Sequence, residues 1–136
     1  MWTNSAATVG VTLLAGDNTW NSICDSSLKT RLGFVNTKEM LDKVSQLPIS
    51  RWHHKDGDPN LQHIGPMAQD FWSAFHVGGD SLKISTLDPS GIALAAIQEL
   101  AKQNSKLEEE LNELRAQVQS LMADKLQSLT TSHKGE

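Results

Sequence analysis

The amino-acid sequence predicts an α+β protein in which a small mixed head is followed by a long C-terminal helix that forms a parallel coiled coil. Three observations predict this fold class. Short apolar segments with helical or strand-like spacing fill residues 9–87. Apolar residues then recur at coiled-coil spacing from Ile97 to Leu121, and no proline follows Pro89.

Length, charge and cysteine content limit the size of the head and the classes of partner. Of the 136 residues, those outside the long helix can support only a modest core. A net charge of -4 and the lack of a basic run argue against a nucleic-acid surface. No apolar run approaches the roughly 20 residues of a membrane span, and the first residues lack the pattern of a signal peptide. The single cysteine, Cys24, leaves a free thiol, which is compatible with a reducing compartment.

The first half of the head is expected to hold one short strand and one helix. Residues 9–14 are β-branched and alternate weakly, which indicates a strand, and a turn follows at 16–18. Thr37 can cap a helix that runs to Leu47, where Pro48 stops it.

The second half of the head is expected to alternate between strands and a helix. Residues 49–54 and 62–65 are predicted to be extended, with a turn between them. Pro66 opens a helix that Gly78-Gly79 ends, and residues 82–87 alternate as a further strand.

The C-terminal helix is predicted to begin with Asp88 as its cap and Pro89 at its first position. Its apolar seam advances by alternating steps of three and four residues, which is the period of a coiled coil. Lys125 and Ser128 fall on the next two seam positions and end it. The seam consists of Ile97, Asn104, Leu111 and Val118 at heptad position a, and Leu100, Leu107, Leu114 and Leu121 at position d.

A seam of this width buries little in a monomer, so the helix needs partner helices. Asn104 at an a position lowers stability but specifies register and strand number. Glu110 and Arg115 can pair between parallel neighbours. The pattern does not decide the number of strands, because Leu111 and Asn104 weaken the preference for a dimer. The alternative is a helix packed only on its own head, but charged flanks and a partly polar seam are typical of self-association.

Four motifs follow one another along the chain: CDSSLK at 24–29, Trp52, HIGPMAQD at 63–70 and GIALAAIQEL at 91–100. In this order and spacing they resemble the C-terminal intramolecular chaperone, the auto-cleaving domain of bacteriophage endosialidases and tail spikes. The resemblance runs from about residue 20 to residue 121. That family carries the signature Ser-Asp-x-Arg-Leu-Lys, so the chain departs from it at Cys24 and at Ser27.

The resemblance implies a homotrimer that drives assembly of a fibre or spike lying upstream in the same precursor, and then cuts itself away. The bond to be cut joins Ile23 to Cys24, with Cys24 and Lys29 as the catalytic dyad and Asp25 and His63 in support. The resemblance implies that residues 1–23 end the client fibre or form a linker, 24–87 form the head, 88–129 the trimerisation helix and 130–136 a flexible tail. It places the protein in the cytoplasm of the producing host cell, or in the virion tail if uncut.

The chemistry can be stated from the residues alone. The sulfur of Cys24 would attack the carbonyl of Ile23, and water would then hydrolyse the thioester. The amine of Lys29 can act as base only in its neutral form, which burial favours. Residues five apart lie about 140° apart around an α-helix, so these two side chains meet only across a bend, for which residues 25–27 are suited. No cofactor or metal is expected, since His53, His54 and His63 lack ligand spacing.

Two further interpretations stay open. The same trimerising module can serve as an uncleaved structural cap, in which the replacement by Cys24 has silenced the chemistry. A more distant interpretation is a coiled-coil oligomerisation segment that carries an unrelated small domain, for which Ser27 in the signature is the only support.

Overall fold

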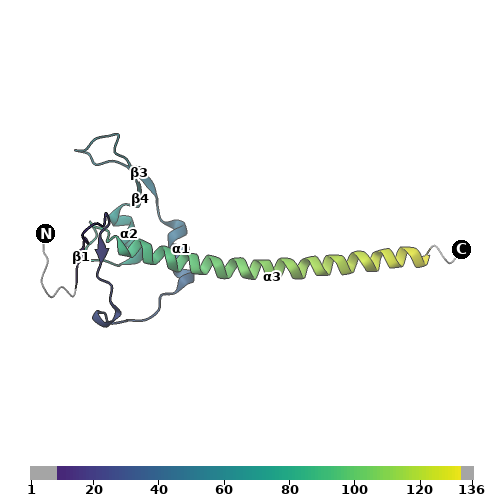
Figure 1. Cartoon of the computed structure of the whole chain (residues 1–136). Coiled ribbons are helices and arrows are strands. Elements are labelled where there is room, and N and C mark those ends of the chain that lie inside the picture. The colour runs from purple at the N-terminus through teal and green to yellow at the C-terminus, as the bar shows by residue number, and fades with distance from the viewer. Residues whose placement is uncertain (1–8, 133–136) are drawn as a thin grey trace. The chain divides into compact units, whose positions relative to one another are not determined.

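The computed structural model describes residues 9–132 of the chain, which divide into two compact units, residues 9–34 and residues 35–132 (Figure 1). The predicted mixture of short helices and strands before a long C-terminal helix is confirmed. Residues 1–8 of the predicted upstream segment and residues 133–136 of the predicted tail lie outside the described residues. In chain order the elements are β1 (Val11–Thr12), β2 (Asn21–Ser22), a 3-10 helix η1 (Ser26–Leu28), α1 (Thr37–Gln46), β3 (Ser50–Trp52), β4 (His63–Gly65), α2 (Ala68–Phe75) and α3 (Leu87–Ser132).

The first unit is built on the antiparallel pair β1–β2, in which Val11 lies opposite Ser22. The strand predicted over 9–14 is therefore found, but it spans only two residues. Asp17 organises the connection: its carboxylate accepts hydrogen bonds from the Thr19 backbone N–H (3.1 Å) and from Asn21 Nδ2 (2.9 Å). These bonds, with that from Asn21 the strongest, hold the pKa of Asp17 below its usual value.

Helix α1 begins one residue before the predicted cap. Asn36 has extended backbone angles, and its side chain accepts a hydrogen bond from the Glu39 N–H at 3.2 Å, so Asn36 is the cap. The prediction that Thr37 caps the helix is wrong, because Thr37 is already helical and its hydroxyl contacts α3 instead. The helix ends at Gln46, before Pro48, as expected.

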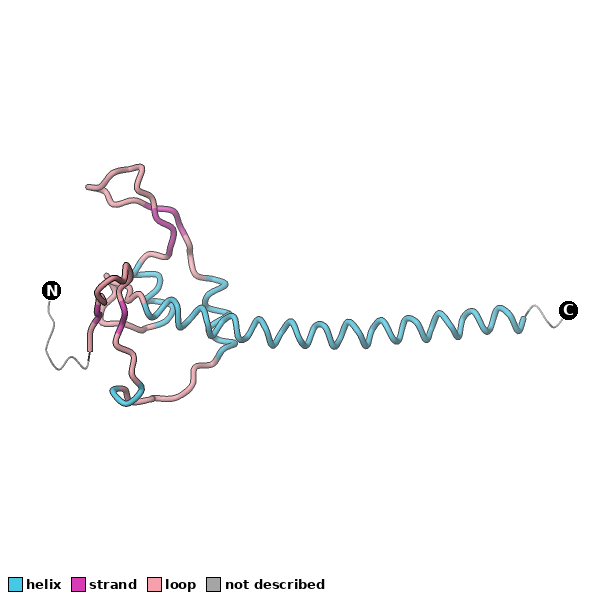
Figure 2. The backbone as a smooth tube through the Cα atoms, viewed as in Figure 1, coloured by secondary structure: helices cyan, strands magenta, loops and turns pink. Residues whose placement is uncertain are grey.

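Strands β3 and β4 form a two-stranded antiparallel hairpin, drawn in magenta in Figure 2, with Trp52 opposite His63. Both predicted extended segments are found, although each is shortened to three residues. Helix α2 follows and ends at His76, which adopts the left-handed conformation (φ 52°). The prediction that Gly78-Gly79 ends this helix is therefore wrong by two residues.

The strand predicted over 82–87 is also wrong: residues 81–86 form a turn and loop, and α3 begins at Leu87. Asp80 accounts for this, because its carboxylate accepts from the Leu82 N–H at 2.7 Å and from Lys83 Nζ at 3.0 Å, which closes a turn. At the start of α3 the Ser85 hydroxyl accepts from the Leu87 N–H at 3.3 Å. Asp88 thus lies inside the first turn of the helix and is not its cap.

The core of the second unit lies where α1 and α2 pack on the first turns of α3. Phe71 and Phe75 on α2 are buried, as are Ala95 and Ala96 on α3. Two small residues in succession allow the neighbouring elements to approach the α3 backbone closely. Every side chain described from residue 101 to residue 129 is exposed, so α3 continues far beyond the part that the head covers (Figure 2).

A polar link fastens α1 to α3 at the edge of this core. The Thr37 hydroxyl donates to Glu99 Oε2 at 2.7 Å, and Lys102 Nζ donates to the Thr37 hydroxyl at 3.1 Å. Gln103 Nε2 donates to the other carboxylate oxygen of Glu99 at 3.3 Å. The bond from Thr37 is the main reason why the pKa of Glu99 lies below its usual value, with the bond from Gln103 and the nearby ammonium of Lys102 adding to it.

We expect this link to make the stability of the head depend on acid. A carboxylate whose pKa is lower in the folded state stabilises the fold above its unfolded pKa, near 4.5, and the stabilisation is lost as the pH falls through the lowered value. Glu99→Gln should therefore flatten the loss of stability below about pH 5, measured as the urea midpoint at a series of pH values. Glu109→Gln, on an exposed part of α3, is the matched control, and equal pH profiles for the two variants would contradict the role of Glu99.

Candidate functional site

The side chains of Cys24 and Lys29 are in direct contact in the first unit. Lys29 Nζ donates to Cys24 Sγ at 2.7 Å. Both residues are exposed, and with Ser26, Thr30 and Arg31 they line an open cavity of about 400 Å³. The structure thus brings a nucleophilic sulfur and an amine together at the positions that the signature motif singled out.

A single 3-10 turn creates this contact. Asp25 is extended, and its carboxylate accepts from the Ser27 N–H at 2.8 Å, which caps the helix η1. Within the turn the Lys29 N–H donates to the Ser26 carbonyl at 3.3 Å. Because the chain is extended on both sides of so short a turn, residues five apart meet across it, as the sequence predicted for a bend at this place.

Asp25 acts in this structure as the support of the turn. The backbone N–H of Ser27 is the first cause of the lowered pKa of the Asp25 carboxyl, and the side chain of Ser27 contributes further. Its carboxylate is therefore ionised at neutral pH and committed to the turn. Asp25 positions Cys24 and Lys29 through the backbone.

The residue on the other side of the predicted cleavage bond is also held. The Ile23 N–H donates to the Gly10 carbonyl at 2.9 Å, which extends the β1–β2 pairing by one bond. The peptide bond between Ile23 and Cys24 therefore lies between a residue tied to the strand pair and a capped turn. Such tethering on both sides limits the positions that the carbonyl can take relative to the sulfur.

His63, predicted to support the dyad, lies in the second unit, whereas Cys24, Asp25 and Lys29 lie in the first. Its ring packs on Trp52 across the β3–β4 hairpin, with ring centroids 4.6 Å apart. His54 meets the same indole edge-on at 5.2 Å. The contacts of His63 are thus those of a hairpin-stabilising aromatic, and its supporting role in the chemistry stays a prediction.

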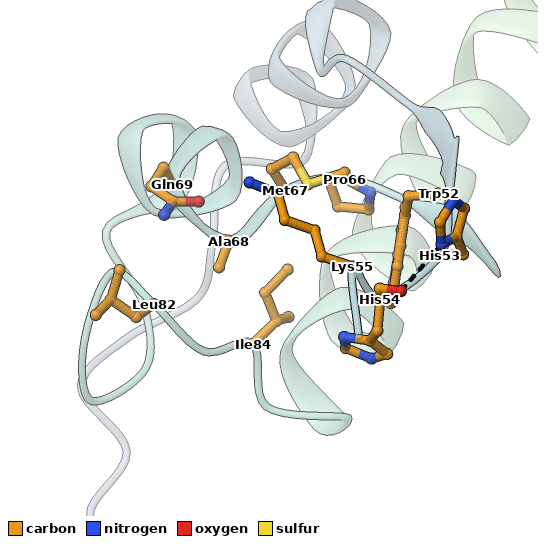
Figure 3. Close-up of a pocket in the computed structure, with 10 residues that line it drawn as sticks. All are labelled: Trp52, His53, His54, Lys55, Pro66, Met67, Ala68, Gln69, Leu82 and Ile84. Atoms are coloured by element: carbon orange, nitrogen blue, oxygen red, sulfur yellow. Dashed lines mark hydrogen bonds between the residues drawn. The ribbon is translucent and has the colours of Figure 1, made fainter. Parts of the chain in front are cut away.

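A second open cavity, of about 550 Å³, lies beside this hairpin (Figure 3). Its lining comes from the end of β3 and the following loop, the start of α2, and Leu82 and Ile84 of the loop before α3. Sequence reasoning missed it because the alternation of Leu82 and Ile84 suggested a strand. The indole Nε1 of Trp52 is buried and has no hydrogen-bond partner among the described residues.

The seam residues of α3 are exposed to solvent in the single chain. The exposed fractions of its seven apolar members lie between 46% for Leu111 and 68% for Leu121. The head packs on other positions of the heptad, since Ala95, Ala96 and Glu99 lie at f, g and c. The head therefore leaves the a and d positions from Ile97 onward uncovered.

Two further features, a metal-ligand cluster and a membrane-spanning helix, are not found in residues 9–132. No group of three or more His, Cys, Asp or Glu side chains there is arranged to hold a metal ion. Among the described helices, none has the length and hydropathy needed to cross a bilayer.

We expect Trp52 to stabilise the hairpin through its ring and not through its N–H. Trp52→Phe keeps an aromatic ring, removes an unpaired donor and should leave the denaturation midpoint close to that of the original protein. Trp52→Ala removes the ring that His54 and His63 contact and should cost about 2 kcal/mol or more. Trp20→Ala, at an exposed tryptophan, is the control, with an expected change within about 0.5 kcal/mol. If Trp52→Phe proved as destabilising as Trp52→Ala, the indole N–H would be needed after all.

Comparison with known proteins matches residues 24–79 to the family described as chaperone of endosialidase. No curated protein and no solved structure matches the chain. The matched segment begins at Cys24 and includes the capped turn, α1, the β3–β4 hairpin and α2. The match over residues 24–79 supports the resemblance to the endosialidase-chaperone family that the motifs predicted.

Proposed function

We propose that the chain is an intramolecular chaperone that trimerises through α3, assists the folding of a fibre or spike upstream in the same precursor, and releases it by cutting between Ile23 and Cys24. The contact of 2.7 Å between Lys29 Nζ and Cys24 Sγ carries this proposal. It falls at the first residue of the family match, so the candidate nucleophile stands at the boundary between the chaperone domain and whatever precedes it.

The exposed seam supports the assembly step. Leu100, Leu107 and Leu114 at d positions are each about half exposed or more in the single chain, and they stand in a row along one helix. Burying such a row against identical helices removes apolar surface from water and leaves the charged flanks in solvent. Three parallel copies would place the first turns of three α3 helices, with the α1 and α2 helices beside them, at the same end of the bundle. Such an arrangement would align the three client chains for folding.

The proposed cleavage proceeds in two balanced steps. Lys29 takes the proton of the Cys24 thiol, the sulfur attacks the Ile23 carbonyl carbon, and the C–N bond breaks as the ammonium of Lys29 returns the proton to the leaving amine. This gives a thioester between Ile23 and the Cys24 sulfur. Water then adds to the thioester, which yields the carboxylate of Ile23 and restores the thiol of Cys24.

Exposure of the pair suggests how cleavage would be tied to assembly. A base must be neutral to take a proton, and burial favours the neutral form of an amine. Cys24 and Lys29 are both exposed in the single chain, and in this proposal the covering surface is supplied by the assembled trimer or by the folded client. The cut would then follow assembly and would not release an unfolded fibre.

A second candidate is the uncleaved structural cap. It is favoured by Cys24, which stands where the family signature has serine. In this alternative the Cys24–Lys29 contact is a structural hydrogen bond, and trimerisation is the whole function.

Intact mass of the purified chain tests the cleavage. We expect two fragments, one ending at Ile23 and one beginning at Cys24, and we expect Cys24→Ala and Lys29→Ala each to leave only the full-length mass. Lys83→Ala, at an exposed lysine in the second unit, is the control and should still be cut. A full-length mass for the original chain, with cutting restored by Cys24→Ser, would favour the structural cap.

Replacement of Asn104 tests the specificity of the seam. Asn104→Leu should raise the thermal stability of the assembly, because it removes a buried polar group, and should broaden or change the mass in solution. Asn112→Leu makes the same change at position b, outside the seam, and should leave the mass unaltered. If Asn104→Leu stays a trimer and gains only stability, Asn104 does not specify strand number.

A further inference from the structure

The apolar stripe of α3 divides into two paths after Val118. The regular heptad continues to Leu121 but then meets Lys125 and Ser128. A second path runs through Met122, Leu126 and Leu129, whose exposed fractions in the single chain are 68%, 68% and 59%. The helix itself continues through both, to Ser132.

The second path has the spacing of a register shift. From Val118 it advances by four, four and three residues, so one step of four replaces the expected step of three. The intervals from Leu111 to Met122 and from Val118 to Leu129 are each eleven residues, and an eleven-residue repeat is a known coiled-coil period of about 3.67 residues per turn. The change therefore continues a coiled coil and does not interrupt it.

Helix geometry explains why such a shift is useful here. A strict heptad stripe drifts by about 20° per heptad around a straight helix, which must supercoil to keep the stripe facing its partners. Eighteen residues make about five whole turns, so Leu129 returns to the line of Leu111, and Met122 to the line of Asn104. After the shift the apolar stripe has thus recovered the angle lost over the preceding heptads.

The position of the charged residue Lys125 also distinguishes the two paths. In the unshifted register Lys125 occupies an a position, where a parallel bundle brings the ammonium groups of all copies together in an apolar seam. In the shifted register Leu126 takes position a and Lys125 moves to the flank, at g. There its carbon chain covers the seam while its charge stays in water.

We infer that the contact between copies of this chain extends to Leu129 through a one-residue shift of the heptad register after Val118, made by one step of four residues in place of three. This inference rests on the proposed trimerisation and names its occupant as the same helix of the other copies. The surface is continuous with the seam from Ile97 to Leu121 on one unbroken helix. It also gives the last turns of α3 packing partners, without which an exposed helix end is only marginally stable.

Disulfide formation between copies tests the register. In a parallel bundle each seam residue faces its own equivalent, so a cysteine there is oxidised to a cross-link far more easily than one on the outer face. The full chain with Cys24→Ala keeps the introduced cysteine as its only thiol. Single replacements by cysteine are made at Leu114, Asp124, Lys125, Leu126 and Leu129, and the rate of cross-linking is followed on non-reducing gels.

The inference predicts cross-linking at Leu126 and Leu129 at a rate close to that at Leu114, and several-fold slower cross-linking at Lys125 and Asp124. Faster reaction at Lys125 than at Leu126 would overturn it, because the heptad then continues unshifted. Reaction at Leu114 alone would also overturn it, because the seam then ends near Leu121. Failure at Leu114 itself would contradict the proposed parallel trimerisation, and this inference with it. Circular dichroism of each variant checks that α3 remains helical.

Discussion

The structure depends on one constraint: α3 is far longer than the head can cover. Phe71 and Phe75 of α2 line a common cavity with Pro89, Ile92 and Ala93 in the first turns of α3. From residue 100 to residue 129 every described side chain is exposed. A lone helix of this length with a continuous apolar row is poorly stable in water and prone to associate. In the proposed assembly the small head is only one end of a larger body, and its polar link at Glu99 leaves the seam free for other copies.

The proposed assembly through α3 also bears on the Cys24–Lys29 pair. The two side chains are in contact and open to solvent, so the cleavage that we propose would have its geometry in place before water is excluded. The Asp25 cap supplies the geometry through the backbone, and the bond from Ile23 to the Gly10 carbonyl steadies the peptide that we propose is cut. Exclusion of water is the remaining requirement, and a neighbouring copy or folded client would provide it. Association through the exposed seam of α3 would thus come first, and cleavage at Cys24 would follow it.

Much of this arrangement follows from local sequence signals. Pro48 and the apolar face before it place α1, and the spacing from Ile97 onward places α3, because proline chemistry and helical period act within a few residues. The predicted secondary structure was wrong where a hydrogen bond to another side chain determined the local conformation. Asp80 closes a turn that overrides the strand-like alternation of Leu82 and Ile84. The partner of the Thr37 hydroxyl, Glu99, is 62 residues away, so local sequence indicates a cap at Thr37 where the fold uses it to contact α3. The Cys24–Lys29 contact was foreseeable only as a bend, since the actual separation depends on one capped 3-10 turn.

The most direct test of the account is the mass of the chain in solution. Sedimentation equilibrium of the full chain with Cys24→Ala, which prevents cleavage from mixing species, should give three times the 14.9 kDa chain mass over a wide range of concentration. A mass of 14.9 kDa that persists as the concentration rises would contradict it, because the exposed seam would then have no partner of its own kind.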